Sequence, residues 1–372
     1  MTDKALLAWC SLWRAPGVGI KSYLKLLEIF ESPEVFFALG EAEIRKRLPD
    51  VAASKWRAWR EAAGSGEADM AWLAQGEGRH ILTLHDPLYP ELLRQIDDPP
   101  PLLFVHGEVG ALSAAQVAIV GSRNATVPAL QTARAFAGEL AKHGWVVTSG
   151  MALGADGAAH EGALDAGGLT VAVVGTGLDR VYPARHKALA HRIVAQGAMV
   201  SEFPIGTGVR GNHFPRRNRI ISGLATGVLV VEASMQSGSL ITARMALDQG
   251  REVFAIPGSI HHPLAKGCHQ LIKQGAKLTE SIADMLEELP AVQGVSVVPD
   301  TESGAQTTPA AEAAAVDAPT QAVLDALGFA PASLDDLVAR TDLTGAEISA
   351  ILLMLELDGQ VAVLPGQRFQ RI

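Results

Sequence analysis

Hydrophobic residues follow two different spacings along the chain. In the first 80 residues they recur every three or four positions, which is typical of amphipathic helices, and we predict helices over 4–13, 20–30, 41–48 and 54–74. From residue 102 onward, short β-branched runs alternate with helical patterns. The sequence therefore predicts a helical domain over 1–80, followed by a domain of mixed strands and helices over 81–289.

The 81–289 segment has the pattern of an α/β fold. Its strands are almost wholly apolar, which indicates that they are buried on both faces of a parallel sheet. The predicted strands are 102–105, 117–120, 145–148, 170–174, 198–201, 227–231 and 252–256, and the predicted helices are 129–143, 155–165, 186–195 and 240–249. We predict an extended Rossmann-like doubly wound sheet, in which ligands bind at the carboxyl ends of the strands.

The two ends of the chain have patterns of their own. Near the N-terminus, a Gly-x-Gly turn at 15–19 separates two helices, as in helix-hairpin-helix or SAM-like domains. Such a turn can bind phosphate through backbone N–H groups, or it can simply connect the two helices. Residues 290–319 are rich in Pro, Ala, Ser, Thr and Gly and contain few large apolar groups, so we predict a flexible linker.

The last segment, 320–372, is predicted to be a winged-helix domain. Its helices are expected at 321–327, 334–340 and 345–357, and two strands at 361–364 and 368–372 form the wing. The third helix would be the recognition helix, but it contains Glu347 and Glu356 and no Lys or Arg. Carboxylates in a DNA groove would face phosphates, so we interpret this domain as a protein-contact module or a vestigial DNA binder.

Charge is distributed unevenly along the chain. The total is −9, but residues 1–110 carry −4, residues 111–279 carry +7 and residues 280–372 carry −12. A basic middle between acidic ends favours a polyanionic partner for the middle segment. Only two cysteines occur, far apart, which fits the reducing cytoplasm, and no apolar run approaches the roughly 20 residues of a membrane span.

Small residues follow several predicted strands at the point where each strand ends. The loops begin at Gly121, Ser149, Gly175 and Ser237, and Arg123 is the one large cation among them. Loops of this kind let backbone amides approach an anion closely. Neither a Gly-x-Gly-x-x-Gly fingerprint nor a Walker loop is present, so dinucleotide chemistry and ATP hydrolysis are disfavoured.

Three arginines and an asparagine occupy four consecutive positions within 213–223, His-Phe-Pro-Arg-Arg-Asn-Arg-Ile-Ile-Ser-Gly. We expect a charged loop held between buried apolar residues. Arginine offers a planar fork of donors that suits phosphate oxygens, so an anionic ligand is one interpretation. The alternatives are a solvated loop with a few ion pairs, or, for Arg219, a structural ion pair with Glu202 or Glu232.

In combination, these motifs resemble the DprA/Smf family of DNA-processing proteins. The resemblance spans about 90–280, where the family motifs occur in order. They include Val120-Gly-Ser-Arg123, Ser149-Gly-Met-Ala-Leu-Gly-Ala-Asp156, Val181-Tyr-Pro183, Ser201-Glu-Phe-Pro204, Phe214-Pro-Arg-Arg-Asn-Arg219 and Ser237-Gly-Ser-Leu-Ile-Thr-Ala243.

The resemblance implies a cytoplasmic protein that binds single-stranded DNA during natural transformation, protects it and helps to load RecA recombinase onto it. It implies a homodimer, without catalytic residues, metal, cofactor or membrane contact. Family members often carry a lysine just before the Phe-Pro pair, and Arg210 is the nearest cation here. Phe214 is either a base-stacking platform or part of the core. The DNA-binding residues implied are Ser122, Arg123, Lys187, Arg210, Phe214, Arg216, Arg217, Asn218, Arg219, Ser237, Gly238 and Ser239.

Other functions remain as alternatives. The main one is a Rossmann-type enzyme similar to nucleotide phosphoribohydrolases, although 235–239 lacks their Pro-Gly-Gly-x-Gly-Thr loop. Another is an adaptor whose crevice holds a free nucleotide. Asp156 and His160, four apart, could form a metal or acid–base pair, but we favour capping and packing by Asp156. The His261, His262, Cys268 and His269 group lacks ordinary metal-ligand spacing.

Overall fold

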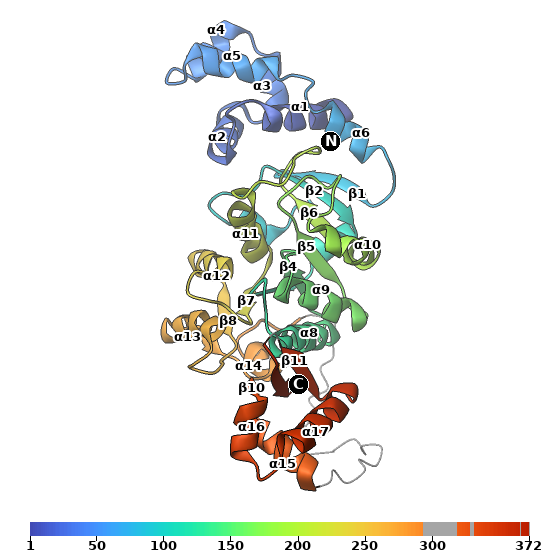
Figure 1. Ribbon diagram of the computed structural model, residues 1–372. Coiled ribbons are helices and arrows are strands. Elements are labelled where there is room, and N and C mark those ends of the chain that lie inside the picture. Colours follow the sequence, from blue (N-terminus) through green and yellow to red (C-terminus); the bar gives the residue numbers. More distant parts are fainter. Residues whose placement is uncertain (293–317, 328–330, 365, 372) are drawn as a thin grey trace. The chain divides into compact units, whose positions relative to one another are not determined.

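The computed structural model describes residues 1–292, 318–327, 331–364 and 366–371 (Figure 1). The chain divides into two compact units, one of 1–125 with 129–295 and one of 126–128 with 296–372. Of the predicted linker 290–319, residues 293–317 lie outside the described residues. No helix of the described part is long and apolar enough to cross a membrane.

The first unit begins with six short helices: α1 (Asp3–Arg14), α2 (Ile20–Phe30), α3 (Pro33–Ala38), α4 (Glu41–Arg47), α5 (Ala53–Glu61) and α6 (Glu67–Leu73). The tryptophans of α5 and α6 are buried in their core. The single helix predicted over 54–74 is wrong, because Gly64 takes a φ of +85° and breaks it. The amides of Gly64 and Gly66 donate instead to Ser11 Oγ at 3.1 and 3.3 Å, which ties the break to α1.

A nine-stranded sheet follows, in the order β1-β2-β6-β5-β4-β3-β7-β8-β9. The strands from β6 to β9 in this order are parallel, while β1 and β2 are antiparallel additions at one edge. The edge strands β1 and β9 were not predicted; β9 is only two residues long. The strands are β1 (Arg79–Thr83), β2 (Leu102–Gly107), β3 (Gln116–Val120), β4 (Val146–Ser149), β5 (Thr170–Val173), β6 (Ala198–Ser201), β7 (Gly227–Val230), β8 (Glu252–Ala255) and β9 (Lys277–Leu278).

Helices cover both faces of the sheet, which explains why the strands are apolar on both sides (Figure 1). Along β3, Val117 and Ile119 face one helical layer and Ala118 and Val120 face the other. The first layer contains α8 (Val127–Lys142), α9 (Ala155–Asp165), α10 (Lys187–Gln196) and α14 (Ile282–Leu286), and the second contains α7 (Glu91–Arg94), α11 (His213–Leu224), α12 (Gly238–Asp248) and α13 (Lys266–Lys273). The predicted doubly wound α/β fold is confirmed.

Helix α11 corrects the expectation of a charged loop over 213–223. The arginines lie on a helix of 12 residues, and Pro215 is tolerated because it occupies the first turn, where its missing N–H has no intrahelical partner. Ile220, Ile221 and Leu224 bury the helix against the sheet. The arginines are therefore held on a rigid element.

The second unit has the predicted winged-helix architecture. Its elements are α15 (Ala318–Leu327), β10 (Ala332–Ser333), α16 (Leu334–Arg340), α17 (Gly345–Leu357), β11 (Val361–Leu364) and β12 (Arg368–Arg371), with strand order β10-β12-β11. Capping boxes begin both α16 and α17, through Ser333 with Asp336 and Thr344 with Glu347. Glu347 of the would-be recognition helix is thus engaged in capping its own helix.

Candidate nucleic-acid interface

A crevice of about 620 Å³ lies at the carboxyl ends of β3 and β7. These two strands are neighbours, and the chain leaves them toward opposite sides of the sheet, which is where ligands bind in doubly wound folds. Four segments line the crevice: the loop after β3, the loop after β4, one side of α11 and the start of α12. Of the predicted DNA-binding residues, the crevice brings together Ser122, Arg123, Phe214, Arg217, Asn218, Ser237, Gly238 and Ser239.

Backbone geometry brings the loops after β3 and β4 close together. Gly154 has a φ of +82°, and a Cβ there would overlap the carbonyl oxygens of Ser122 and Arg123. The amide of Ala155 donates to Ser122 O at 3.2 Å. Only glycine permits this approach, so the Gly-rich motif at 149–157 serves to shape the crevice wall.

The start of α12 places small residues at the same crevice. Ser237 is the N-cap, and its Oγ accepts from the amide of Ser239 at 3.3 Å and lies 2.6 Å from Ser239 Oγ. Asn218 Nδ2 donates to Gly238 O at 3.5 Å, which links α12 to α11. The small residues leave room for an anion at this helix N-terminus, where the helix dipole favours negative charge.

Arg217 forms the cationic floor of the crevice. Its side chain is 95% buried, Nη1 donates to the carbonyls of Gly150 and Val173, and Nε donates to Asn218 Oδ1 at 3.0 Å. Burial lowers the pKa of Arg217 from 12.5 to about 10, although the nearby Asp156 opposes this effect. The guanidinium is therefore a desolvated positive charge whose hydrogen-bond partners are neutral.

Asp156 is the one carboxylate that lines the crevice. Burial raises the pKa of Asp156, against the opposing influence of Arg217. Its Oδ2 accepts from the amide of Ala152 at 3.2 Å, and the N-cap of α9 is Gly154. Asp156 is therefore not the N-cap that we predicted. It stabilises the loop after β4 by accepting a hydrogen bond from its backbone.

Arg123 lies at the mouth of the crevice, exposed to solvent. Its guanidinium carbon is 5.6 Å from the ring centroid of Phe214, and the Phe214 ring is in turn 5.6 Å from that of Tyr182. Tyr182 was not among the predicted site residues. The signal that could have found it is an aromatic residue in a loop after a strand, within the motif Val181-Tyr-Pro183.

The other two arginines of α11 face away from the crevice. Arg219 is 96% buried and donates through Nη1 and Nη2 to the two carboxylate oxygens of Glu202, at 3.0 and 2.9 Å, and through Nε to Asp98 Oδ2 at 3.0 Å. Arg216 also pairs with Glu202, at 2.9 Å, and lies over the rings of Trp13 and Phe203. The alternative of an ion pair between Arg219 and Glu202 is thus confirmed, and these two arginines connect α11 to α1 and to the loop after β6.

Lys187 and Arg210 do not line the crevice. Lys187 is exposed at the first residue of α10, and Arg210 is exposed in the loop before α11. The structure therefore places Lys187 and Arg210, like Arg216 and Arg219, outside the crevice.

His160 and Cys268 are engaged inside the fold. His160 Nδ1 lies 2.7 Å from Thr170 Oγ1, and burial lowers the pKa of His160 to about 3. Cys268 contacts the carbonyl of Val230, and burial raises its pKa to about 12. Within the described ranges, no group of three or more His, Cys, Asp or Glu residues could hold a metal ion.

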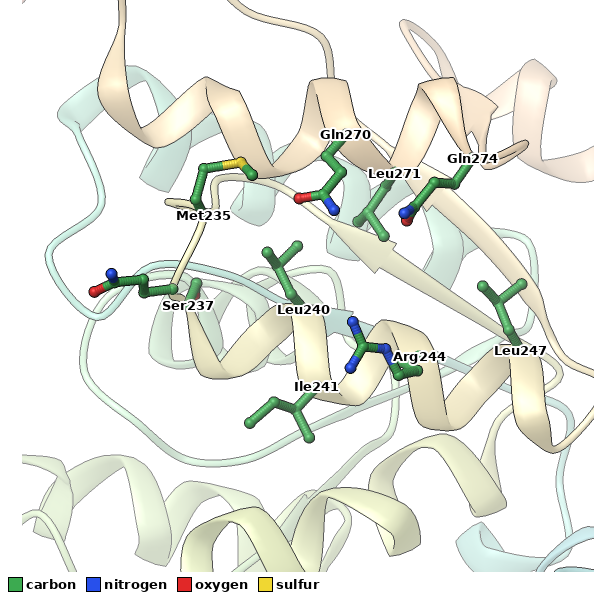
Figure 2. A pocket seen from close by; sticks show the side chains of 10 residues that line it. Met235, Ser237, Leu240, Ile241, Arg244, Leu247, Gln270, Leu271 and Gln274 are labelled. Carbon is green, nitrogen blue, oxygen red and sulfur yellow. The ribbon is translucent and has the colours of Figure 1, made fainter.

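A second depression, of about 270 Å³, lies between α12 and α13 (Figure 2). Leu240 and Leu247 project into it from α12 and Leu271 from α13, and Arg244 is its one charged residue among the described residues that line it. The lining of this groove is divided between apolar side chains and polar ones, the latter including Gln236, Gln270 and Gln274. It presents one arginine to a ligand, whereas the crevice on the other side of α12 presents two.

Comparison with known proteins gives consistent matches. The family model for DNA recombination-mediator protein A matches residues 80–290, and the model for the DprA winged helix domain matches 307–367. Protein Smf of Escherichia coli is 42% identical over 301 residues, covering 81% of this chain and 79% of the relative. DNA processing protein DprA of Bacillus subtilis is 43% identical over 295 residues, covering 78% and 91%.

Two solved structures are also similar. DNA processing protein A of Streptococcus pneumoniae gives a TM-score of 0.68 at 37% identity, covering 78% of this chain and 99% of that one. DNA processing protein A of Helicobacter pylori, whose structure concerns its single-stranded DNA binding mode, gives a TM-score of 0.51 at 30% identity, covering 56% and 95%.

Proposed function

Because this chain belongs to the DprA/Smf family of DNA-processing proteins, we propose that its crevice binds the backbone of single-stranded DNA. The strand's phosphates contact Arg123 at the mouth, Arg217 at the floor and the N-terminus of α12. The Helicobacter pylori relative, which binds single-stranded DNA, supports this assignment. The bound strand is recognised through its backbone, with little dependence on base sequence.

One observation carries the proposal: the crevice holds two arginines and a single, buried carboxylate, Asp156, to which neither arginine is bonded in a salt bridge in the described part of the chain. Among the described residues, neither Arg123 nor Arg217 forms a salt bridge. The cost of holding the desolvated guanidinium of Arg217 is recovered when an anion binds. Arg216 and Arg219, which Glu202 already neutralises, are positioning residues in this proposal.

Family membership alone supports the wider role. We propose that the protein acts as a homodimer in the cytoplasm, that it is not an enzyme, and that it passes the bound strand to RecA during natural transformation. The alternative, a phosphoribohydrolase-like enzyme, would use the same crevice for a free nucleotide. In that alternative, Arg123 and Arg217 would bind the phosphate of a mononucleotide as well as they bind those of a DNA strand.

Fluorescence anisotropy with labelled oligonucleotides tests the proposal. A single-stranded oligo-dT should bind more tightly than a duplex of equal length, and the logarithm of its affinity should fall linearly with the logarithm of salt concentration. Unlabelled AMP or dTMP in large excess should displace it poorly. Tight mononucleotide binding without oligonucleotide binding would contradict the proposal and favour the enzyme.

A further inference from the structure

Tyr182 differs from every other aromatic residue in the described part of the chain. Its side chain is 46% exposed, whereas each remaining Trp, Tyr and Phe ring of the described residues is buried or half-buried. Single exposed aliphatic residues are common on protein surfaces and need no explanation. Here the one exposed ring lies next to the mouth of the crevice.

The position of Tyr182 is fixed by a layered arrangement of side chains. The Arg123 guanidinium lies over the Phe214 ring at 5.6 Å, and the Tyr182 ring lies 5.6 Å from Phe214 with an interplanar angle of 37°. Gly175 packs against the edge of Phe214, since a Cβ at that position would be 3.3 Å from Cδ1. Phe214 is thus covered on several sides, and Tyr182 is the outer, accessible ring.

We propose that Tyr182 forms a base-binding subsite, on which an unpaired nucleobase stacks while the adjoining phosphates occupy the crevice. This inference rests on the proposed function and adds to it a residue that contacts the base. In it, Phe214 is a positioning residue, because it connects the phosphate-binding Arg123 to the base-binding Tyr182. The subsite of Tyr182 also refines the expectation that Phe214 itself is the stacking platform.

Stacking on Tyr182 would favour single strands over duplex DNA, which phosphate contacts in the crevice do not do by themselves. Every base has a π-face, so stacking tolerates any sequence, but a base inside a duplex is already stacked on its neighbours and unavailable. Two exposed cations, Arg185 and Lys187, follow Tyr182 in the chain. In this proposal they contact the phosphates that follow the stacked base. The predicted DNA contact of Lys187 would then lie outside the crevice.

The test compares Tyr182→Leu with Tyr182→Phe on two ligands, an oligo-dT and an abasic oligonucleotide of the same length. Tyr182→Leu should weaken oligo-dT binding about tenfold and leave abasic binding within twofold of the parent protein. Tyr182→Phe keeps the ring and should stay within twofold on both ligands. The slope of log affinity against log salt should not change in either variant, because no phosphate contact is removed.

Two controls keep the outcomes distinct. Leu88→Ala changes another exposed side chain, 50% exposed, and should leave both affinities unchanged. Thermal unfolding checks that each variant is folded, and 2-aminopurine fluorescence in the oligonucleotide gives a second readout of stacking.

Equal weakening on oligo-dT and abasic ligands, or no weakening by Tyr182→Leu, would overturn the subsite while leaving the crevice proposal standing. If the parent protein binds neither ligand, the proposed function itself fails.

Discussion

The two sides of helix α11 carry the same kind of residue for different purposes. Arg219 and Arg217 are two positions apart and almost equally buried, at 4% and 5% exposure. Arg219 donates to the carboxylates of Glu202 and Asp98, whereas Arg217 donates to carbonyl oxygens and to an amide. Arg219 is therefore held in salt bridges within the fold, whereas Arg217 forms none with the described residues.

This difference shows that burial alone does not reveal whether an arginine is structural. What decides is the charge of its partners, because a carboxylate cancels the positive charge and a carbonyl only solvates it. The side of α11 with Arg216 and Arg219 stabilises the contact with α1, where Trp13 Nε1 donates to Glu202 O at 2.7 Å. The side with Arg217 and Asn218 keeps a charge available to a ligand.

The largest effect should follow from Arg219→Met. This change removes the side chain that donates to both carboxylate oxygens of Glu202, which is fully buried. Removal of one member of a buried ion pair costs about 3–5 kcal/mol. Urea unfolding followed by circular dichroism should show that loss in the free energy of unfolding. The double variant with Glu202→Gln should recover much of it, and equal losses in the single and double variants would contradict the assigned partner.

Arg217→Met should affect DNA binding more than it affects stability, which is the opposite of what we expect for Arg219→Met. It leaves the carbonyls of Gly150 and Val173 without a donor, at a cost of about 1–3 kcal/mol, but it also removes a charge that burial disfavours. Its effect on unfolding should therefore be smaller than that of Arg219→Met. Affinity for oligo-dT, measured by anisotropy on folded protein, should fall about 10- to 100-fold. Unchanged affinity would mean that the two sides of α11 do not differ in function.

Much of this architecture could be predicted from the sequence because it depends on local patterns. The helices α9, α16 and α17 begin and end where the apolar spacing and the small or capping residues place them. The loops that line the crevice follow strands whose apolar runs are unmistakable. In contrast, the edge strand β1 begins with the polar pair Arg79 and His80 and lacks a continuous apolar run, and β9 has only two residues.

The division of the arginines could not be predicted, because it depends on contacts distant in sequence. Asp98 is 121 residues from Arg219, and Gly150 is 67 residues from Arg217. The helix itself was missed since its first turn contains Pro215 and its middle is a polar run, which conceals the spacing of its apolar positions. Sequence alone offered Glu202 or Glu232 as partners of Arg219, and only the fold selects Glu202.

Arg123→Ala should give a smaller loss, confined to binding. Arg123 is exposed and forms no ion pair in the described part of the chain, so the free energy of unfolding should change by less than about 0.5 kcal/mol. Affinity for oligo-dT should fall several-fold for all base sequences, and the salt slope should decrease by about 1, the signature of one lost phosphate contact. Arg123→Lys is the matched control and should preserve the slope. A slope that does not change in Arg123→Ala would place the strand elsewhere.

The smallest effect on DNA binding should come from Arg216→Ala, which is also the closest control for the comparison of the two sides of α11. Its guanidinium shares Glu202 with Arg219 and lies 5.4 Å from the Trp13 ring and 5.2 Å from the Phe203 ring, but it is 36% exposed, so Glu202 retains its main partner when it is removed. We expect a loss of about 1 kcal/mol in the free energy of unfolding, measured in urea, and no more than a twofold change in oligo-dT affinity. Arg216 is adjacent in sequence to Arg217 and more exposed, so any model in which DNA binding depends on exposed basic residues of α11 predicts the opposite ranking. A binding loss in Arg216→Ala as large as in Arg217→Met would therefore refute the division of the helix into a bracing side and a ligand side.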